Sequence, residues 1–179
     1  MIDTATPVPN AELTTQAPVY FSVSIPKLVC LSFCSFGIYE LYWFYKNWQL
    51  ERGRAHEALS PFWRTIFTVF FCYSLFKRVI VTGSKAGLFA GGGAGLLATL
   101  YIIVSISWNL PDPYSLISLL TVLPLAMVQK IAGKINDRLT PGAPRNARFS
   151  PANFILVALG GPLFLYGVAS AFFPNLWPS

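Results

Sequence analysis

Glu40 is the acidic residue that lies well inside an apolar run of this sequence. A carboxylate within a membrane segment is a functional candidate by default, usually with a partner nearby. It could relay protons, or it could be structural, reaching the headgroup region or pairing with Arg64 or Arg78. The structural interpretation is favoured, because Lys46 follows about one and a half helical turns later and aromatic residues fill the interval.

A second group with chemical potential is the basic segment 129–139, QKIAGKINDRL. Its cations recur every four residues and its isoleucines form the adjacent stripe, a pattern typical of a helix on an anionic lipid surface. Two later arginines extend the patch. The predicted lipid-surface residues are Lys130, Lys134, Arg138, Arg145 and Arg148.

Other chemistry has little support in the residue types. The chain has one histidine and three cysteines, and it lacks the common nucleotide-binding, serine-hydrolase and zinc-protease motifs. Cys30 and Cys34 share a helical face and could join Cys72 in a soft metal site. Apolar packing of these cysteines is the favoured interpretation. We therefore predict no enzyme activity, no catalytic residue, no metal and no cofactor.

Composition indicates the element type that positions these residues. Of 179 residues, 54% are hydrophobic and 11% are charged, whereas soluble domains have about a quarter charged. Several apolar runs approach the roughly 20 residues that cross a bilayer. We predict an all-α integral membrane protein, with a disordered tail at 1–20 and one helical membrane domain at 21–179.

Four transmembrane helices are expected at about 28–45, 86–107, 114–128 and 153–173. Ser60-Pro61, Asp112-Pro113 and Ser150-Pro151 each mark a helix start, because proline suits the first helical position after a capping side chain. The five tryptophans fall at the ends of apolar runs, which is typical of residues at the membrane interface.

Segment 62–81 is contested, because it is apolar but contains three cations. If it spans, there are five crossings and the thirteen Lys and Arg divide nine against four. If it is an interfacial or re-entrant helix, there are four crossings. Twelve of the thirteen Lys and Arg then lie on one side of the membrane, and Lys27 lies alone on the other. The positive-inside rule favours the four-span arrangement, with both termini outside. The net charge of +6 is therefore attributed to loops that face one side of the membrane. No nucleic-acid partner is predicted.

Small residues suggest where helices approach one another. Gly83, Gly87, Gly91 and Gly95 recur every four residues, which on one helix would form a smooth packing face. That face could pack within this chain or against a second copy or partner protein. Gly160, Gly161 and Pro162 lie in the last predicted span, where proline predicts a kink.

The stretch GIYELYWFYKNW, residues 37–48, precedes SPFWR at 60–64 and FCYSLF at 71–76. Over roughly residues 20–140, these motifs resemble a family of small bacterial inner-membrane proteins without an established activity. The resemblance implies a multi-pass protein of the bacterial cytoplasmic membrane. It implies no role for any particular residue.

Two functional hypotheses follow. The leading one is a non-enzymatic scaffold, assembly or immunity-type component that acts through helix–helix and anionic-lipid contacts, including self-association. The alternative is a small channel or transporter for ions or small solutes, motivated by Glu40 and by the Gly-Gly-Pro sequence.

Overall fold

The computed structural model describes residues 17–55, 58 and 60–173, and within them all extended regular elements are helices. An isolated bridge joins Val23 to Asn146. Residues 1–16 of the predicted tail lie outside the described residues. Residues 17–20 do not behave as a tail, because the Tyr20 side chain is fully buried in the core.

The helices follow one another along the chain with short connections. They are α1 (Ile25–Cys34), α2 (Ile38–Ala55), α3 (Pro61–Ile66), α4 (Thr68–Lys85), α5 (Ala94–Ile106), α6 (Val122–Leu139) and α7 (Pro151–Phe172), with 3₁₀ helices η1 (Ser107–Asn109) and η2 (Tyr114–Thr121).

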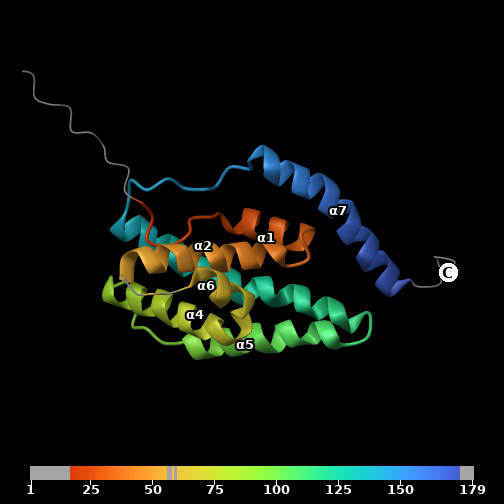
Figure 1. The fold of residues 1–179 in the computed structure, drawn as a ribbon, viewed down its shortest axis with the longest axis horizontal. Helices are drawn as coiled ribbons and strands as arrows, with labels where there is room; N and C mark the ends of the chain where they lie inside the picture. Colours follow the sequence, from red (N-terminus) through yellow and green to blue (C-terminus); the bar gives the residue numbers. More distant parts are fainter. Residues whose placement is uncertain (1–16, 56–57, 59, 174–179) are drawn as a thin grey trace, which may run out of the picture.

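The predicted span at 28–45 is wrong, because two helices occupy it. The chain leaves α1 at Ser35 and turns through Phe36 and Gly37, both with positive φ, before α2 begins. Glycine adopts such a conformation without a steric penalty. The turn makes α1 and α2 a helical hairpin, so the chain returns toward the end from which it came (Figure 1).

The contested segment also divides, into α3 and α4. Pro61 begins α3, as predicted, although the Ser60 side chain makes no capping hydrogen bond. The predicted span at 86–107 is too long, because α5 starts at Ala94. Gly91, Gly92 and Gly93 all have positive φ and form the loop before it.

The last two predicted spans fall on longer helical segments. Segment 114–128 lies within η2 and α6, which together run from Tyr114 to Leu139. Segment 153–173 corresponds to α7, which begins at Pro151 as expected. Tyr114–Leu139 and Pro151–Phe172 are the two helical segments among the described residues that are long and apolar enough to cross a membrane. The prediction of four such helices is not supported.

Side-chain contacts define how the helices run. The pairs Glu40–Thr121 and Trp43–Gln129 place α2 parallel to α6. The Phe44–Phe76 stack and the Glu51–Arg78 ion pair place α2 parallel to α4.

The helices α2, α4 and α6 therefore finish at one end of the bundle, which Figure 1 shows on the left. We call it the cationic end, because no Lys or Arg lies in the segments that form the other end. Lys46 and Lys77 lie near the middle of α2 and α4. The remaining cations are Lys27, Arg52, Arg54, Arg64, Arg78, Lys85, Lys130, Lys134, Arg138, Arg145 and Arg148. The opposite end, the cation-free end, consists of 35–40, 66–70 and 105–121, which contain no Lys or Arg.

Both topologies expected from the charge pattern are therefore wrong on one point. The four-span arrangement separated Lys27 from the other cations, and the five-span arrangement separated residues 46–64. The α1–α2 hairpin removes that separation, because α1 starts at the cationic end and α2 returns to it. Lys27 donates to the Asn146 side chain and to the Arg148 carbonyl.

Aromatic side chains fill the centre of the bundle. Phe44 contacts Trp43, Phe76 and Tyr101 with ring centroids 5.2–5.9 Å apart. Trp43 and Trp48 are fully buried, so the prediction that they lie at a membrane interface is wrong. Trp63 and Trp108 are exposed, and Trp177 lies outside the described residues.

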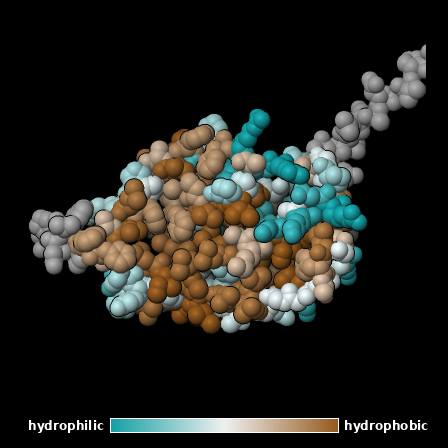
Figure 2. All heavy atoms as spheres, turned by 180° about the vertical axis from the view of Figure 1, so that it is seen from behind, coloured by the Kyte–Doolittle hydropathy of each residue, from teal (hydrophilic) through white to brown (hydrophobic). Residues whose placement is uncertain are grey.

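The outer surface is unusually apolar. Figure 2 shows hydrophobic side chains over most of one face and hydrophilic ones gathered near the cationic end. In α7, Phe154, Ile155, Leu159, Leu163 and Leu165 are each at least 60% exposed. An apolar patch of this extent normally contacts protein or lipid.

Candidate functional site

A row of buried polar residues follows one face of α2 from end to end. Glu40, Trp43, Asn47 and Glu51 are each at most 5% exposed, and their spacing of three or four residues places them on the same helical face. Glu40 was singled out from sequence, whereas Asn47 and Glu51 were not. The polar row within a hydrophobic helix was the signal that could have identified them.

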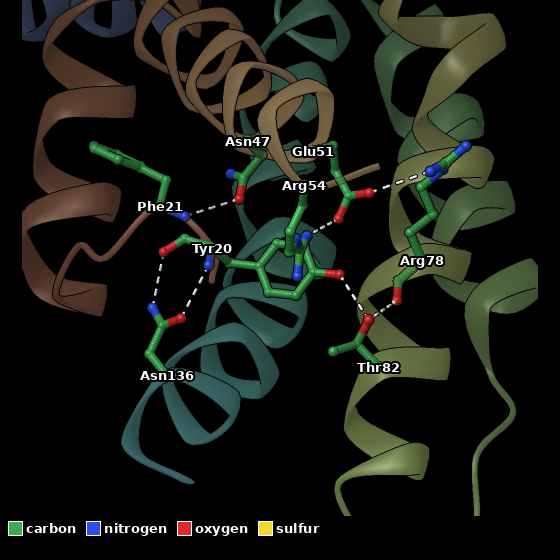
Figure 3. A network of polar contacts seen from close by, with 8 residues as sticks. All are labelled: Tyr20, Phe21, Asn47, Glu51, Arg54, Arg78, Thr82 and Asn136. Carbon is green, nitrogen blue, oxygen red and sulfur yellow. Dashed lines mark hydrogen bonds and ion pairs between the residues drawn. The ribbon is translucent and has the colours of Figure 1, made fainter. Parts of the chain in front are cut away.

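At the cationic end, amide side chains hold the extended segment 20–23 against the bundle (Figure 3). Asn136 of α6 accepts from the Tyr20 backbone N–H at 2.9 Å and donates to the Tyr20 carbonyl at 2.8 Å. Asn47 accepts from the Phe21 N–H at 3.0 Å. These bonds satisfy buried backbone groups that no sheet partner could serve, so the segment is an integral part of the fold.

Glu51 is neutralised by arginines from two helices. It pairs with Arg54, one turn later in α2, and with Arg78 of α4 at 3.2 Å. The Arg54 guanidinium also lies 4.6 Å from the centre of the Tyr20 ring. Figure 3 shows these side chains converging between the helices. A carboxylate with two cationic partners satisfies the usual requirement for a buried charge.

The Tyr20 hydroxyl completes this network through a 3.0 Å hydrogen bond with Thr82. Burial raises the pKa of Tyr20 above its ordinary value, and the nearby Glu51 carboxylate adds to the increase, while Thr82 and Arg54 oppose it. The hydroxyl therefore stays neutral at physiological pH. This network is structural, because it connects segment 20–23 with α2, α4 and α6.

Three of the five predicted lipid-surface residues lie around one cavity. Lys130, Lys134 and Arg145 line a space of about 320 Å³ together with Asp137. Asp137 accepts from Arg145 at 2.8 Å. Arg138 and Arg148 are also exposed at this end but do not line the cavity. The arrangement concentrates positive charge beside a surface that is open to ligands.

At the cation-free end, Glu40 faces a larger cavity of about 600 Å³. The Thr121 hydroxyl donates to its carboxylate at 3.0 Å, and the Tyr101 side chain also hydrogen-bonds it. The cavity is formed where several connections of the chain meet. Its lining residues are Ser32, Phe36, Gly37, Ile38, Glu40, Leu41, Ile66, Val69, Tyr101, Ser105, Trp108, Ser118, Leu119 and Thr121.

The cationic partners expected for Glu40 lie elsewhere. Arg78 pairs with Glu51, and the Arg64 guanidinium stacks over the Trp48 ring with 4.6 Å to its centre. Because α2 is about 27 Å long, Glu40 near its start is far from the arginines near its end. The expectation of a pair with Arg64 or Arg78 is therefore wrong.

The glycines have different roles from those expected. The predicted ladder is interrupted, since Gly83 is in α4, Gly87 and Gly91 are in the connection, and Gly95 is in α5. A Cβ at Gly83 would lie 2.7 Å from the Phe89 ring. The four residues therefore do not form one continuous packing face.

Gly160 of α7 lies directly against the backbone of α1. A Cβ added there would overlap the Cys34 carbonyl oxygen of α1, whereas one added at Gly161 would meet ordinary contact distances. Pro162 lies within α7, which continues through it as one helix and bends along its length in Figure 1. Gly160 is thus a helix-packing residue.

The cysteines are not grouped. Cys30 and Cys34 lie on α1, while Cys72 is buried in α4. Across the part of the chain that the structure describes, no three His, Cys, Asp or Glu side chains are close enough to hold a metal ion. His56 lies outside the described residues.

Comparison of the chain with models of protein families, with curated proteins and with solved structures finds no match.

Proposed function

We propose that this chain is a non-enzymatic multi-pass protein of a bacterial cytoplasmic membrane that acts through contacts with anionic lipid headgroups and with other helices. The observation that carries the proposal is the separation of charge, because none of the thirteen Lys and Arg lies in the segments that form the opposite end of the bundle. Cytoplasmic loops of membrane proteins are enriched in these residues. The cationic end accordingly faces the cytoplasm.

The exposed apolar surface supports the same conclusion. Only 6% of the apolar window of α7 is buried within the chain, although this helix is long enough to cross a bilayer. A soluble protein would bury such a helix in its core. With lipid around it, α7 runs from the cytoplasmic surface to the opposite one, so that its last residue, Phe172, lies on the outer side.

The cavity between α6 and residues 145–147 is the proposed headgroup site. Lys130, Lys134 and Arg145 surround it, and each basic residue near an anionic membrane contributes about 1 kcal/mol of attraction. The apolar residues of α6 lie directly beside these cations along the helix. The phosphate of an anionic lipid can therefore contact the cavity while the acyl chains of the same lipid lie along the bundle surface.

Labelling of single cysteines tests the orientation, after Cys30, Cys34 and Cys72 are replaced by serine. Ala17→Cys and Arg52→Cys should both be shielded from an impermeant reagent in intact cells, because both residues are exposed and the α1–α2 hairpin keeps them on one side. Asp112→Cys should react. If residues 17 and 52 lie on opposite sides, α1 and α2 form one crossing and the proposed orientation is wrong.

Retention of phosphatidylglycerol by the purified protein, measured by native mass spectrometry, tests the headgroup site. The triple variant Lys130→Gln/Lys134→Gln/Arg145→Gln should lose about 3 kcal/mol of attraction, roughly 100-fold in affinity. The matched control is Arg52→Gln/Lys77→Gln/Lys85→Gln, which removes the same charge outside the cavity. Equal losses in both variants would contradict a defined headgroup site.

A further inference from the structure

We propose that the cavity at the cation-free end binds a small organic ammonium ion through the Glu40 carboxylate. This proposal is independent of the lipid site at the cationic end, because the two cavities share no residue. It concerns what neutralises Glu40, and it does not require that the ligand crosses the membrane.

Glu40 has no countercharge among the described residues that line its cavity. Glu40 is 3% exposed, and its partners Thr121 and Tyr101 are neutral hydroxyl groups. Among the described residues that line the cavity, none is Lys, Arg or His. A buried carboxyl group is costly in its ionised form unless a cation pairs with it, and without a cation it tends to take up a proton. A cationic ligand in the cavity would supply that pair.

Several hydroxyl oxygens around the carboxylate are able to accept hydrogen bonds. Ser105 and Ser118 already donate their hydroxyl protons to the carbonyls of Tyr101 and Ser115, so their oxygens remain able to accept. The Ser32 hydroxyl is 2% exposed, lines the same cavity and has no hydrogen-bond partner within the described structure. An ammonium group offers N–H donors to these oxygens.

The cavity suits an organic cation better than a metal ion. One carboxylate is a poor match for Ca²⁺, which takes six to eight oxygen ligands, or for Mg²⁺, which usually keeps several waters. The volume of about 600 Å³ is typical of sites for small organic molecules. Tyr101 and Trp108 offer aromatic faces that attract organic cations, and Leu41, Ile66 and Val69 offer apolar surface to the carbon part.

The fold builds this cavity from connections that meet at the cation-free end. Gly37, with φ +85°, turns the chain from α1 into α2 and places Glu40 in the first turn of the new helix. Thr121 ends η2, and Trp108 lies in η1 directly after α5. An ammonium group has two sources, a soluble amine or the headgroup of phosphatidylethanolamine.

Calorimetric titration of the full chain in detergent tests the proposal, with benzylammonium as the probe at up to about 10 mM. The uncharged isostere benzyl alcohol is the comparison. Benzylammonium should bind at least tenfold more tightly, because the alcohol lacks the charge that Glu40 attracts. Equal binding of the two probes, or no detectable binding of benzylammonium, would overturn the proposal.

Three variants locate the binding. Glu40→Gln should abolish the preference for benzylammonium, whereas Glu51→Gln, at the other buried carboxylate, should retain it. Trp108→Leu tests the site if Glu40→Gln fails to fold. Trp108 is exposed, so its replacement should leave the fold intact. Loss of a cation–π contact should weaken binding about 2- to 30-fold. Unchanged binding in a folded Glu40→Gln, or in Trp108→Leu, would refute the assignment.

A separate measurement distinguishes the two sources. Native mass spectrometry of protein with phosphatidylethanolamine or phosphatidylglycerol shows whether the headgroup ammonium is recognised. Retention of phosphatidylethanolamine that Glu40→Gln removes would assign a lipid ligand. Benzylammonium binding with no such lipid preference would assign a soluble amine.

Discussion

Glu51 and Glu40 lie on the same helix, face the same interior and are almost equally buried, at 5% and 3% exposed. Glu51, at the cationic end, meets the guanidinium groups of Arg54 and Arg78. Glu40, at the cation-free end, meets hydroxyl groups and a cavity. The comparison teaches that burial alone does not identify a functional carboxylate. What distinguishes Glu40 is that none of the described residues lining its cavity is a cation.

The two ends are also held together differently. Amides from α2 and α6 bond the backbone of segment 20–23 at the cationic end. Close backbone packing of α7 against the end of α1, at Gly160, holds the side near the cation-free end. The hydrogen bonds at the cationic end need particular donor and acceptor groups. The backbone packing at Gly160 needs a residue without a side chain.

The largest effect is expected from Asn136→Leu at the cationic end. The leucine would leave the Tyr20 N–H and carbonyl buried without their partner, and each such group costs about 1–3 kcal/mol. We expect the free energy of unfolding in detergent to fall by about 2–6 kcal/mol. Hydrogen exchange at the Tyr20 and Phe21 amides should accelerate in parallel.

Asn109→Leu is the matched control for this substitution. Asn109 is exposed and donates to the Ile106 carbonyl within its own turn, so its loss should change the free energy of unfolding by less than about 0.5 kcal/mol. If both variants lose the same stability, the amide bonds to segment 20–23 do not distinguish the cationic end.

A smaller loss is expected from Gly160→Ala. The added methyl group would overlap the Cys34 carbonyl, and overpacking of this kind costs about 1–3 kcal/mol. Gly161→Ala provides a control one residue away, where the contact is ordinary and alanine favours the helix by about 1 kcal/mol. Thermal unfolding in detergent should therefore shift in opposite directions. A stabilising effect of Gly160→Ala would show that α7 does not pack closely on α1.

The elements that could be predicted from sequence are marked by residue types within or next to the element itself. Residue types alone indicated an all-helical chain, and Ser150-Pro151 marked the start of α7 because proline suits the first helical turn. The α1–α2 turn had no comparable signal. Phe36 adopts a positive φ although it is not glycine, and the surrounding residues are as apolar as those of a continuous helix. A hydropathy pattern cannot distinguish a span from a hairpin of similar length.

The site was predictable to a similar degree. Glu40 stood out because an acidic residue is rare in an apolar run. Its partner Thr121 lies 81 positions away, and no spacing rule connects them. The role of Gly160 also depended on tertiary structure, because a Gly-Gly-Pro sequence is equally consistent with a kink and with close packing.

The smallest effect on stability is expected from Asp137→Asn. This substitution also tests directly whether charge at the cationic end governs lipid affinity. Asp137 and Arg145 form an exposed ion pair, with side chains 56% and 69% exposed, and such pairs contribute about 0–1 kcal/mol. The free energy of unfolding should therefore hardly change. The same substitution removes the negative charge beside Lys130 and Lys134, so affinity for phosphatidylglycerol should rise roughly two- to fivefold. Asp112→Asn makes the same change at the cation-free end and should leave lipid affinity unaltered. If Asp112→Asn raises the affinity equally, net charge governs the lipid contact, and the two ends do not differ in the way proposed.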